Sequence, residues 1–436
     1  MSGDPVSAQL EAARATAHHG PSARRERRGS ALCLSGGGFR AALFHLGAVR
    51  RLDELGVLGG LRTVSAVSGG AIVANLLAHP DLEWPDPRSG PGRVGGLEEL
   101  VVEPLRALTR RNVRTPALLS RLRPPGWGSA DVSVRVLADE LERAVPWWGT
   151  DLREHRRGGP AILTGATEVG YGVSWIFADA RSVGPRGRIG DHRLGYAAPP
   201  PGLRIVDAVA ASCAYPPFIA PMQLDGTELG LVGGVPDLDE PQETRELLGR
   251  RILLADGGVY DNLGLEPVWA DHASVLVSDG GAVFRGRHTG SVVGQLWQLL
   301  SIAASGGQTA RLRWLRASFS AGIVQGATWS LESPNTVSAV PGHGPGPELA
   351  AGGGYPAGVV ATINRVRTDL DAFSPGEQMV LERHGYVVCD ASVRRHSPGL
   401  SALPTGRQPP HPQVAGADSA HAALAGSGRI TALGRR

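Results

Sequence analysis

The sequence predicts a three-layer α/β/α fold with a mostly parallel central sheet. Apolar strands are expected at residues 31–34 and at about 62–67, and each is followed directly by a helix, at 41–55 and at 71–77. Strands that alternate with helices at this spacing pair in parallel through right-handed crossovers. The spacing of leucines along residues 41–55 is helical, which supports the assignment.

Later segments extend this pattern. Residues 161–166 and 173–178 predict a β-hairpin. A short helix over 207–213 ends before two prolines, and buried strands are expected at 252–255 and 273–277. Near the end of the body, Ser374-Pro375-Gly376-Glu377 is a capping box, and Gly385 stands where we expect that helix to stop.

The chain length indicates one large domain with an insertion. Its 436 residues exceed the usual single-domain size, yet α/β enzymes of this size fold around one sheet. We expect a main domain over 30–395, with a Pro-rich helical insertion at about 80–159 that lies over or beside the site. The ends, 1–29 and 396–436, are rich in small residues without sustained apolar periodicity. We therefore expect both ends to be disordered.

Charge and cysteine content argue against several functional classes. The formal net charge of +3 is too small to indicate nucleic-acid binding. Every cationic Lys or Arg position is arginine, which excludes a Ser-Lys catalytic pair. Cys33, Cys213 and Cys389 lack metal-ligand spacing, so we expect buried reduced thiols, no metal and a cytoplasmic location. No signal-peptide core or membrane-spanning apolar run is visible, so we expect any membrane contact to be peripheral.

A glycine run follows the first strand, as Ser35-Gly36-Gly37-Gly38-Phe39-Arg40. Glycines allow successive N–H groups at a helix N-terminus to point at one anionic centre. The run also matches a dinucleotide-binding turn, but that turn needs an acidic residue at the end of the second strand. The second strand ends in Val67-Ser68-Gly69-Gly70 instead, which favours an oxyanion loop over a nucleotide loop or a plain turn.

Arg40 follows these glycines in the first helical turn. It is either a surface cation or a residue that fixes the loop by hydrogen bonds to nearby backbone carbonyls, a task that suits the planar guanidinium.

Ser68 occupies the nucleophile position of a G-x-S-x-G elbow, in the form Ala66-Val67-Ser68-Gly69-Gly70. Small neighbours permit a sharp strand-to-helix turn that holds the serine in a strained conformation. An isolated sequence of this kind would more simply be a helix N-cap. Beside the glycine run, we interpret Ser68 as a nucleophile.

A base must take the proton of the serine hydroxyl, and Asp256 is the expected base. It follows an apolar strand and precedes Gly257-Gly258, so its carboxylate should lie at a strand end where ligands of parallel sheets collect. Partial burial there would raise its pKa from about 3.9. A second Asp-Gly-Gly begins at Asp279 and remains an alternative, because either motif alone is an ordinary turn.

Histidines offer weaker candidates for the base. Those that we considered stand in settings typical of packing or surface residues, namely His45, His272, His288, His343 and His384.

Together these motifs resemble the patatin-like phospholipase family, bacterial type, over residues 30 to about 280. The resemblance implies an α/β-hydrolase-related fold with a Ser68-Asp256 dyad and no histidine, and an oxyanion loop at Gly36-Gly37-Gly38-Phe39-Arg40. The string from Asp256 to Asn262 is among its most specific parts, with weaker similarity at 166–177 and 210–216. Ser35 stands where many members have Asp, and Ala66 replaces a glycine. These departures affect the expected substrate preference more than the expected activity.

The resemblance implies a serine lipid acyl hydrolase of the phospholipase A or lysophospholipase type, without a cofactor. Ser68 would attack the ester, Asp256 would accept its proton, and amides of the loop would stabilise the oxyanion. The alternatives are a catalytically silent lipid-binding member of the same fold and a nucleotide-binding oxidoreductase. Either Trp127 and Trp147 touch an anionic membrane transiently, beside the arginines at 110, 111, 114, 121 and 123, or these tryptophans are buried in the core.

Overall fold

The structure is a computed structural model. It describes residues 27–435 except for the segments 87, 123–129, 155–157, 180–187, 237–238, 282–290, 334–353, 404–405, 407, 428–429 and 432–433.

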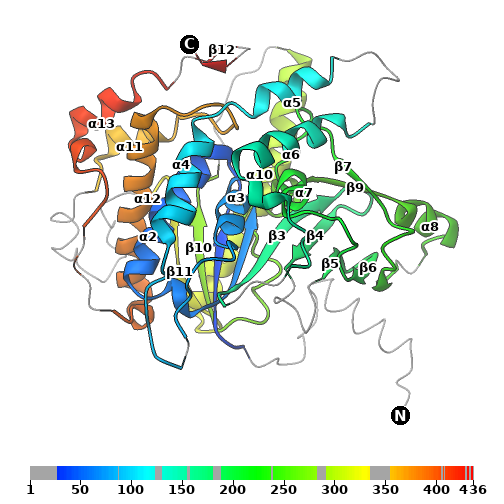
Figure 1. The fold of residues 1–436 in the computed structure, drawn as a ribbon, viewed down its shortest axis with the longest axis horizontal. Helices are drawn as coiled ribbons and strands as arrows, with labels where there is room; N and C mark the ends of the chain where they lie inside the picture. The colour runs from blue at the N-terminus through cyan, green and yellow to red at the C-terminus, as the bar shows by residue number, and fades with distance from the viewer. Residues whose placement is uncertain are drawn as a thin grey trace.

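A mixed β-sheet forms the middle of the molecule (Figure 1). Its parallel part has the order β11 (Gln325–Ser330), β10 (Ser274–Asp279), β1 (Ser30–Leu34), β2 (Leu61–Val67) and β3 (Ala161–Glu168). Antiparallel strands continue it as β4 (Val173–Ala178), β5 (Ile189–Asp191), β6 (Gly195–Ala197) and β8 (Val232–Gly233). The expected α/β fold is confirmed, and so is the predicted hairpin, which is β3 with β4.

Strand β9 (Arg251–Asp256) differs from the expectation for a parallel set. It pairs antiparallel with β3 on one side and with β7 (Met222–Asp225) on the other. Asp256 therefore reaches the site from the direction opposite to that of the parallel strands.

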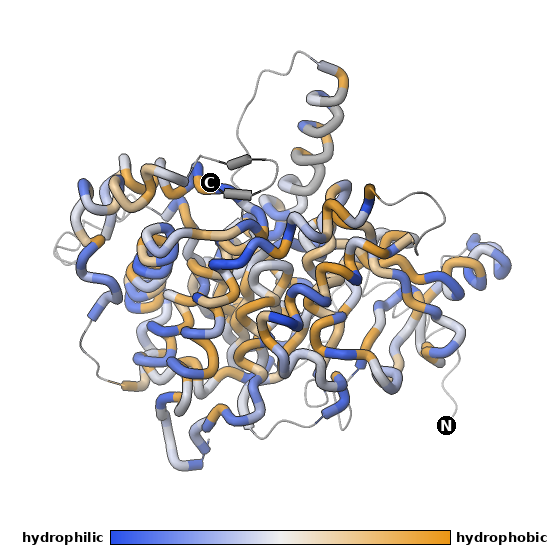
Figure 2. The backbone as a smooth tube through the Cα atoms, turned by 45° about the horizontal axis from the view of Figure 1, so that its top comes forward, coloured by the Kyte–Doolittle hydropathy of each residue, from blue (hydrophilic) through white to orange (hydrophobic). Residues whose placement is uncertain are grey.

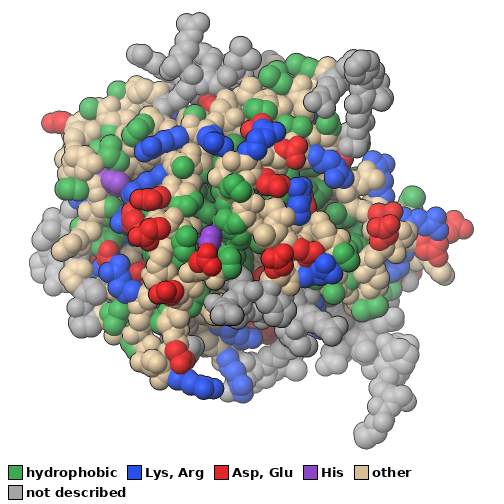
Figure 3. All heavy atoms as spheres, viewed as in Figure 1, with side chains coloured by type: hydrophobic (Ala, Val, Ile, Leu, Met, Phe, Trp, Pro, Cys, Tyr) green, Lys and Arg blue, Asp and Glu red, His purple; other side chains and the backbone are tan. Residues whose placement is uncertain are grey.

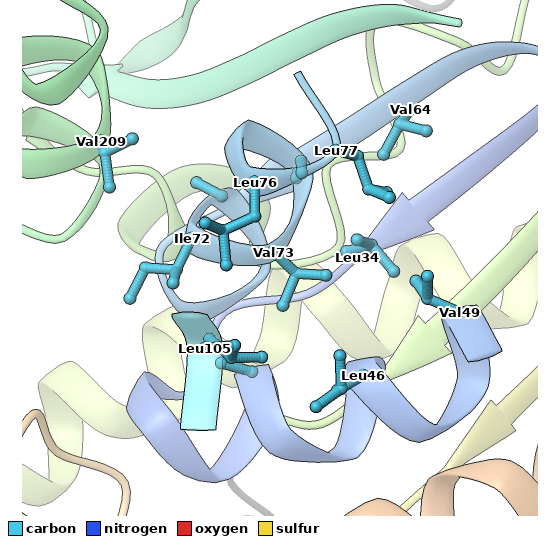
Figure 4. Close-up of a cluster of buried hydrophobic side chains, with 14 of the residues drawn as sticks. Leu34, Leu46, Val49, Val64, Ile72, Val73, Leu76, Leu77, Leu105 and Val209 are labelled. Carbon is cyan, nitrogen blue, oxygen red and sulfur yellow. The ribbon is translucent and has the colours of Figure 1, made fainter. Parts of the chain in front are cut away.

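Helices cover both faces of the sheet. Because side chains alternate along a strand, Leu32 and Leu34 of β1 pack in the larger core with α2 (Gly38–Glu54) and α3 (Gly69–Leu76). Ala31 and Cys33 face a second core that includes Leu315 of α10 (Val292–Ser320). Figure 4 shows Leu34 of β1, Leu46 of α2, Val64 of β2 and Val73 of α3 in the larger core. These two cores give the three layers.

Helix α12 (Pro375–His396) crosses α2 closely. Its capping box is present, since the Ser374 side chain accepts from the Glu377 amide. The expected stop at Gly385 is wrong, because the helix continues to His396, about three turns further. A Cβ on Gly385 would lie 1.8 Å from the Phe44 carbonyl oxygen, and one on Gly47 would lie 1.8 Å from the Glu382 carbonyl oxygen. The glycine thus permits a close helix crossing and does not end the helix.

The remaining helices lie around this frame. They are α4 (Glu103–Thr109), α5 (Arg114–Ser120), α6 (Val132–Ala144), α7 (Ile205–Ser212), α8 (Gln242–Arg250), α9 (Gly258–Asp261), α11 (Ala357–Ile363) and α13 (Ala417–Leu424). Shorter pieces are the 3₁₀ turns Leu58–Gly60, Pro146–Gly149, Pro398–Leu400 and Pro412–Val414, the π-helix Glu98–Val102 and the strand pair β12 (Ile430–Thr431) and β13 (Gly434–Arg435). Helices α4 to α6 belong to the segment where we expected a helical insertion.

The carboxyl-terminal segment differs from the disordered tail expected over 396–436. Val414, Ala420 and Leu424 are buried in the main core. Helix α13 packs on α11 and α12, because Ala420 and Leu424 lie four residues apart on one side of it. Val414 comes from the 3₁₀ turn before this helix. Of the segment 1–29, residues 1–26 lie outside the described part of the chain.

The tryptophans of the insertion are mostly core residues. Trp148 is fully buried, and the half-buried Trp147 packs edge-on to His79 at 4.9 Å between ring centroids. Trp127 lies outside the described residues. The three cysteines are buried and unbonded, as expected. Over the described residues, no helix has the length and apolar character needed to cross a bilayer.

Candidate active site

Ser68 lies in a strained elbow between β2 and α3. Its φ of 51° and ψ of −118° are unusual for a residue with a Cβ, and such a conformation costs about 1–3 kcal/mol. The two following glycines allow the turn to pack tightly. A Cβ on Gly69 would lie 2.1 Å from the Gly38 carbonyl oxygen, and a Cβ on Gly70 would lie 2.2 Å from the Leu34 carbonyl oxygen. The elbow is therefore pressed against the glycine loop.

Strand β3 brings Asp256 to Ser68. The last residue of β2, Val67, pairs with Gly165, and the next residue of β3, Ala166, pairs with Asp256 at the end of β9. Strands β2 and β9 therefore approach each other end to end along the same neighbour. Their carboxyl ends place Ser68 and Asp256 together.

The environment of Asp256 makes it a suitable base at neutral pH. Its side chain is 3% exposed, and burial raises its pKa to about 7, while hydrogen bonds from the Gly258 amide and the Ser68 side chain act in the opposite direction. The Gly258 N–H lies 2.7 Å from Oδ1. The efficiency of a general base is greatest when its pKa lies near the working pH.

The glycine loop between β1 and α2 has two amides that are free for a ligand. Gly37 and Gly38 have positive φ angles of 137° and 60°. The Gly36 amide donates to the Asn262 carbonyl at 3.0 Å, and the Phe39 amide donates to the Asp369 carbonyl at 3.0 Å. The amides of Gly37 and Gly38 donate to no group in the described part of the chain. Of the expected oxyanion donors, these two are the ones that remain available.

Arg40 fixes this loop to two neighbouring segments. Arg40 is buried, with 2% of the residue exposed. One amino group donates to the Val366 carbonyl at 2.9 Å and the other to the Gly281 carbonyl at 2.7 Å. Arg40 is thus buried and bonded to backbone carbonyls, which agrees with the second of the two roles considered for it.

The other Asp-Gly-Gly turn, at Asp279-Gly280-Gly281, contacts the segment that carries the glycine loop. Asp279 accepts from the Gln308 side chain at 2.8 Å and from the Gly281 amide at 3.0 Å. Ser35 Oγ accepts from the Gly280 amide at 2.9 Å. Burial raises the pKa of Asp279, and these partners and the Arg40 charge lower it. The two oxygens of Asp279 thus hold the turn in shape and tie it to α10, while Gly280 and Gly281 of the turn contact Ser35 and Arg40.

A comparison of the sequence with protein families finds a match. Residues 32–269, more than half of the chain, match the patatin-like phospholipase family. The chain belongs to the patatin-like phospholipase family. No curated protein matches the sequence of this patatin-like phospholipase.

Solved structures give distant matches to this patatin-like phospholipase. VipD from Legionella pneumophila matches with 14% identity and a TM-score of 0.33, over 85% of this chain and 67% of VipD. Human GIVD cytosolic phospholipase A2 matches with 14% identity and a TM-score of 0.36, over 64% of this chain and 50% of that protein. A second structure of the human protein, with methyl gamma-linolenyl fluorophosphonate and terbium chloride, has 14% identity and a TM-score of 0.33, over 64% of this chain and 46% of that protein.

Three of the histidines considered as bases in this patatin-like phospholipase, His45, His272 and His384, hydrogen-bond to groups other than Ser68 and Asp256. His45 Nε2 donates to the Ser35 carbonyl at 2.9 Å and His384 Nε2 donates to the Leu331 carbonyl at 3.0 Å. Burial lowers the pKa of each to about 4, so both rings are neutral. His272 bonds the Val268 carbonyl and the Thr63 hydroxyl, and burial lowers its pKa as well. His288 and His343 lie outside the described residues.

Three residues that hold the site were missed from the sequence. Ser212 Oγ accepts from the Ser68 amide at 2.7 Å and donates to the Gly165 carbonyl at 2.6 Å, which ties the elbow to β3. Asn262 and Asp369 accept from the glycine loop through their carbonyls. Ser212 and Asn262 stand in strings that carry the family resemblance, which was a usable signal. Asp369 has no local signal, because only the tertiary fold brings it to the loop.

Proposed function

We propose that this patatin-like phospholipase hydrolyses carboxylic esters of lipids through a dyad of Ser68 and Asp256. The observation that carries the proposal is the strained serine beside a buried carboxylate whose pKa is raised to about 7. Both groups lie at the ends of strands that meet on β3. Family membership supports a lipid ester as substrate.

The first half of the reaction forms an acyl-enzyme. Ser68 Oγ attacks the ester carbonyl carbon while Asp256 accepts the hydroxyl proton. The carbonyl oxygen becomes an oxyanion, which the free amides of Gly37 and Gly38 stabilise. When the tetrahedral intermediate collapses, the bond to the leaving alcohol breaks and the alcohol takes the proton from Asp256. The acyl group then remains on Ser68.

Water completes the cycle. Asp256, again ionised, takes a proton from a water molecule that attacks the acyl carbon. A second tetrahedral intermediate collapses, the bond to Ser68 breaks, and Ser68 Oγ recovers the proton from Asp256. The product is a free fatty acid, and another alcohol in place of water would give acyl transfer.

Labelling by a fluorophosphonate tests the nucleophile. We expect the intact wild-type protein to gain one label at Ser68, located by peptide mass spectrometry, and Ser68→Ala to gain none. Ser212→Ala is a matched control, because this serine contacts the elbow but is not expected to react. A wild-type protein that stays unlabelled and hydrolyses no ester would instead be the silent lipid-binding alternative.

A substrate panel then tests the class of ester. Purified protein is offered phospholipids, lysophospholipids, triglycerides and p-nitrophenyl esters, and the released fatty acid is measured. Hydrolysis of p-nitrophenyl esters without release from any lipid would contradict the proposed lipid substrate.

A further inference from the structure

Helix α10 extends well beyond the sheet on the side of the candidate site. Gln308 lies level with the end of β10, since it donates to Asp279 at 2.8 Å. The helix leads into β11, which starts opposite the start of β10, so α10 runs antiparallel to these strands. Its residues 292–307 therefore project past the carboxyl edge of the sheet by about 24 Å, at 1.5 Å per residue. Figure 2 shows this end of the helix standing clear of the body.

This projecting part is apolar in character and has little packing. Residues 292–310 contain no charged side chain. None of the side chains described between 291 and 307 is buried, and Val292, Leu299 and Ile302 are 72%, 61% and 46% exposed. A helical face of this kind in water needs an apolar partner.

Other exposed apolar side chains connect α10 to the dyad. Val259 follows Gly258, whose amide binds Asp256, and the next residue, Tyr260, accepts from Arg311 of α10 at 2.8 Å. Burial and the nearby Asp256 charge raise the pKa of Tyr215, and the Tyr215 carbonyl accepts from the amide of the exposed Phe218 at 3.1 Å. Exposed apolar side chains therefore lie close in sequence to residues that interact with Asp256, on two separate segments.

Helix α5 continues this surface and adds positive charge. Arg121, just after α5, donates to the Phe218 carbonyl at 3.1 Å, and its neighbours Leu119 and Leu122 are exposed. Residues 104–130 contain no acidic residue but carry arginines at 106, 110, 111, 114, 121 and 123. Figure 3 shows basic side chains spaced across the upper part of the molecule, where Figure 1 places α4 and α5.

We propose that these side chains form a docking face for an anionic phospholipid bilayer. The docking face consists of Val292, Leu299, Ile302, Leu119, Leu122 and Phe218. Its apolar members would enter the interfacial region while the exposed Arg110, Arg111 and Arg121 contact lipid phosphates. Arg106 and Arg114 are instead paired with Glu382 and Asp369. The inference rests on the proposed function, because it brings the Ser68 site to the surface where lipid esters lie. It also moves the expected membrane contact away from Trp147.

Vesicle binding tests the docking face separately from catalysis. Ser68→Ala protein, which cannot turn over, is sedimented with vesicles of phosphatidylcholine containing phosphatidylglycerol, and with vesicles of phosphatidylcholine alone. We expect binding to the anionic vesicles that weakens as salt rises. Adding Leu299→Gln with Ile302→Gln should weaken that binding at least tenfold, and Leu122→Gln should weaken it severalfold. Leu247→Gln is the matched control, an exposed leucine on α8.

Hydrolysis gives the second measurement. With Ser68 intact, Leu299→Gln with Ile302→Gln should reduce hydrolysis of vesicle lipid in the same proportion as binding, while hydrolysis of p-nitrophenyl butyrate stays within twofold. If the wild type hydrolyses no ester but binds vesicles through these residues, the proposed function fails and the docking face stands.

Three results would overturn the docking face. The first is vesicle binding that is unchanged relative to Leu247→Gln. The second is a wild-type dimer that the double variant converts to a monomer without loss of vesicle binding, since α10 would then meet a second copy of the chain. The third is a Tm lowered by the double variant alone with vesicle binding retained, which would show that another part of the same chain covers the helix.

Discussion

Two turns of identical sequence, Asp256-Gly257-Gly258 and Asp279-Gly280-Gly281, have different surroundings. Each follows a buried strand; Asp256 is buried and Asp279 is half-buried. Asp279 is held by Gln308 and lines a cavity of about 360 Å³ beside α10, whose lining includes neither Ser68 nor Asp256. Asp256 faces Ser68. The two aspartates therefore differ in the side chain that each one contacts, Ser68 for Asp256 and Gln308 for Asp279. That contact identifies the candidate base, whereas the Asp-Gly-Gly motif and the nearby cavity do not.

The sharpest contrast between the turns is expected in activity. Asp256→Asn should lower kcat/KM for a soluble ester by about 10³-fold or more, because Ser68 loses its proton acceptor. Asp279→Asn keeps an acceptor for Gln308 and should lower it less than tenfold. Circular dichroism checks that both variants fold. Near wild-type activity in Asp256→Asn would rule out the dyad.

Stability should report the raised pKa of Asp256 in a pH-dependent way. Burial raises the pKa of Asp256 to about 7 in the folded protein, whereas the unfolded chain should lose this proton near pH 4. Between about pH 4 and 7 the unfolded chain is therefore ionised while the folded protein still holds the proton, so the free energy of unfolding falls as pH rises. Asp256→Asn should therefore raise the free energy of unfolding by up to about 4 kcal/mol above pH 7, and by little at pH 4. Urea unfolding of the wild type and of Asp256→Asn, at pH 4 and above pH 7, measures the difference. An equal gain at both pH values would argue against a raised pKa.

The pH profile of the reaction should follow Asp256 as well. Its ionised form is the base, so kcat/KM for an uncharged soluble ester should rise about tenfold per pH unit below 7 and level off above it. Asp279→Asn should leave the midpoint of this profile in place. A midpoint near 4 would mean that the base is an ordinary exposed carboxylate.

A smaller effect is expected where the Asp279 turn supports the glycine loop. Arg40→Lys should lower kcat about tenfold, because one ammonium group cannot reach both the Gly281 and the Val366 carbonyls as the guanidinium does. KM should change less, since Arg40 holds the loop and contacts no substrate. A kcat equal to that of the wild type would leave the arginine with a purely structural role.

Much of the fold could be predicted because its signals are local. The alternation of short strands and helices before residue 80 and the hairpin of β3 and β4 depend on periodicity within a few residues. The direction of β9 could not be predicted, because its pairing with β3 joins segments far apart in the chain. The end of α12 was misplaced because Gly385 serves a contact with α2 that the local sequence does not reveal.

In the candidate site, too, the residues in local motifs could be predicted and the long-range contacts could not. Ser68, Asp256 and the glycine loop stand at strand ends in recognisable strings. Which amides of the loop remain free could not be predicted, because the Asp369 carbonyl that occupies the Phe39 amide comes from a distant segment.

Strands β2 and β9 approach each other end to end along β3, and this arrangement fixes the distance between Ser68 and Asp256 independently of the segments that connect the three strands. Val67 and Asp256 pair with the neighbouring residues Gly165 and Ala166, so the covalent repeat of one strand, about 3.3 Å per residue, sets the distance between the proposed nucleophile, Ser68, and the proposed base, Asp256. The chain between Ser68 and β3, and the chain between β3 and β9, can therefore lengthen, shorten or change sequence without altering that distance. Substrate range could diversify through these two segments while the reacting groups remain in place.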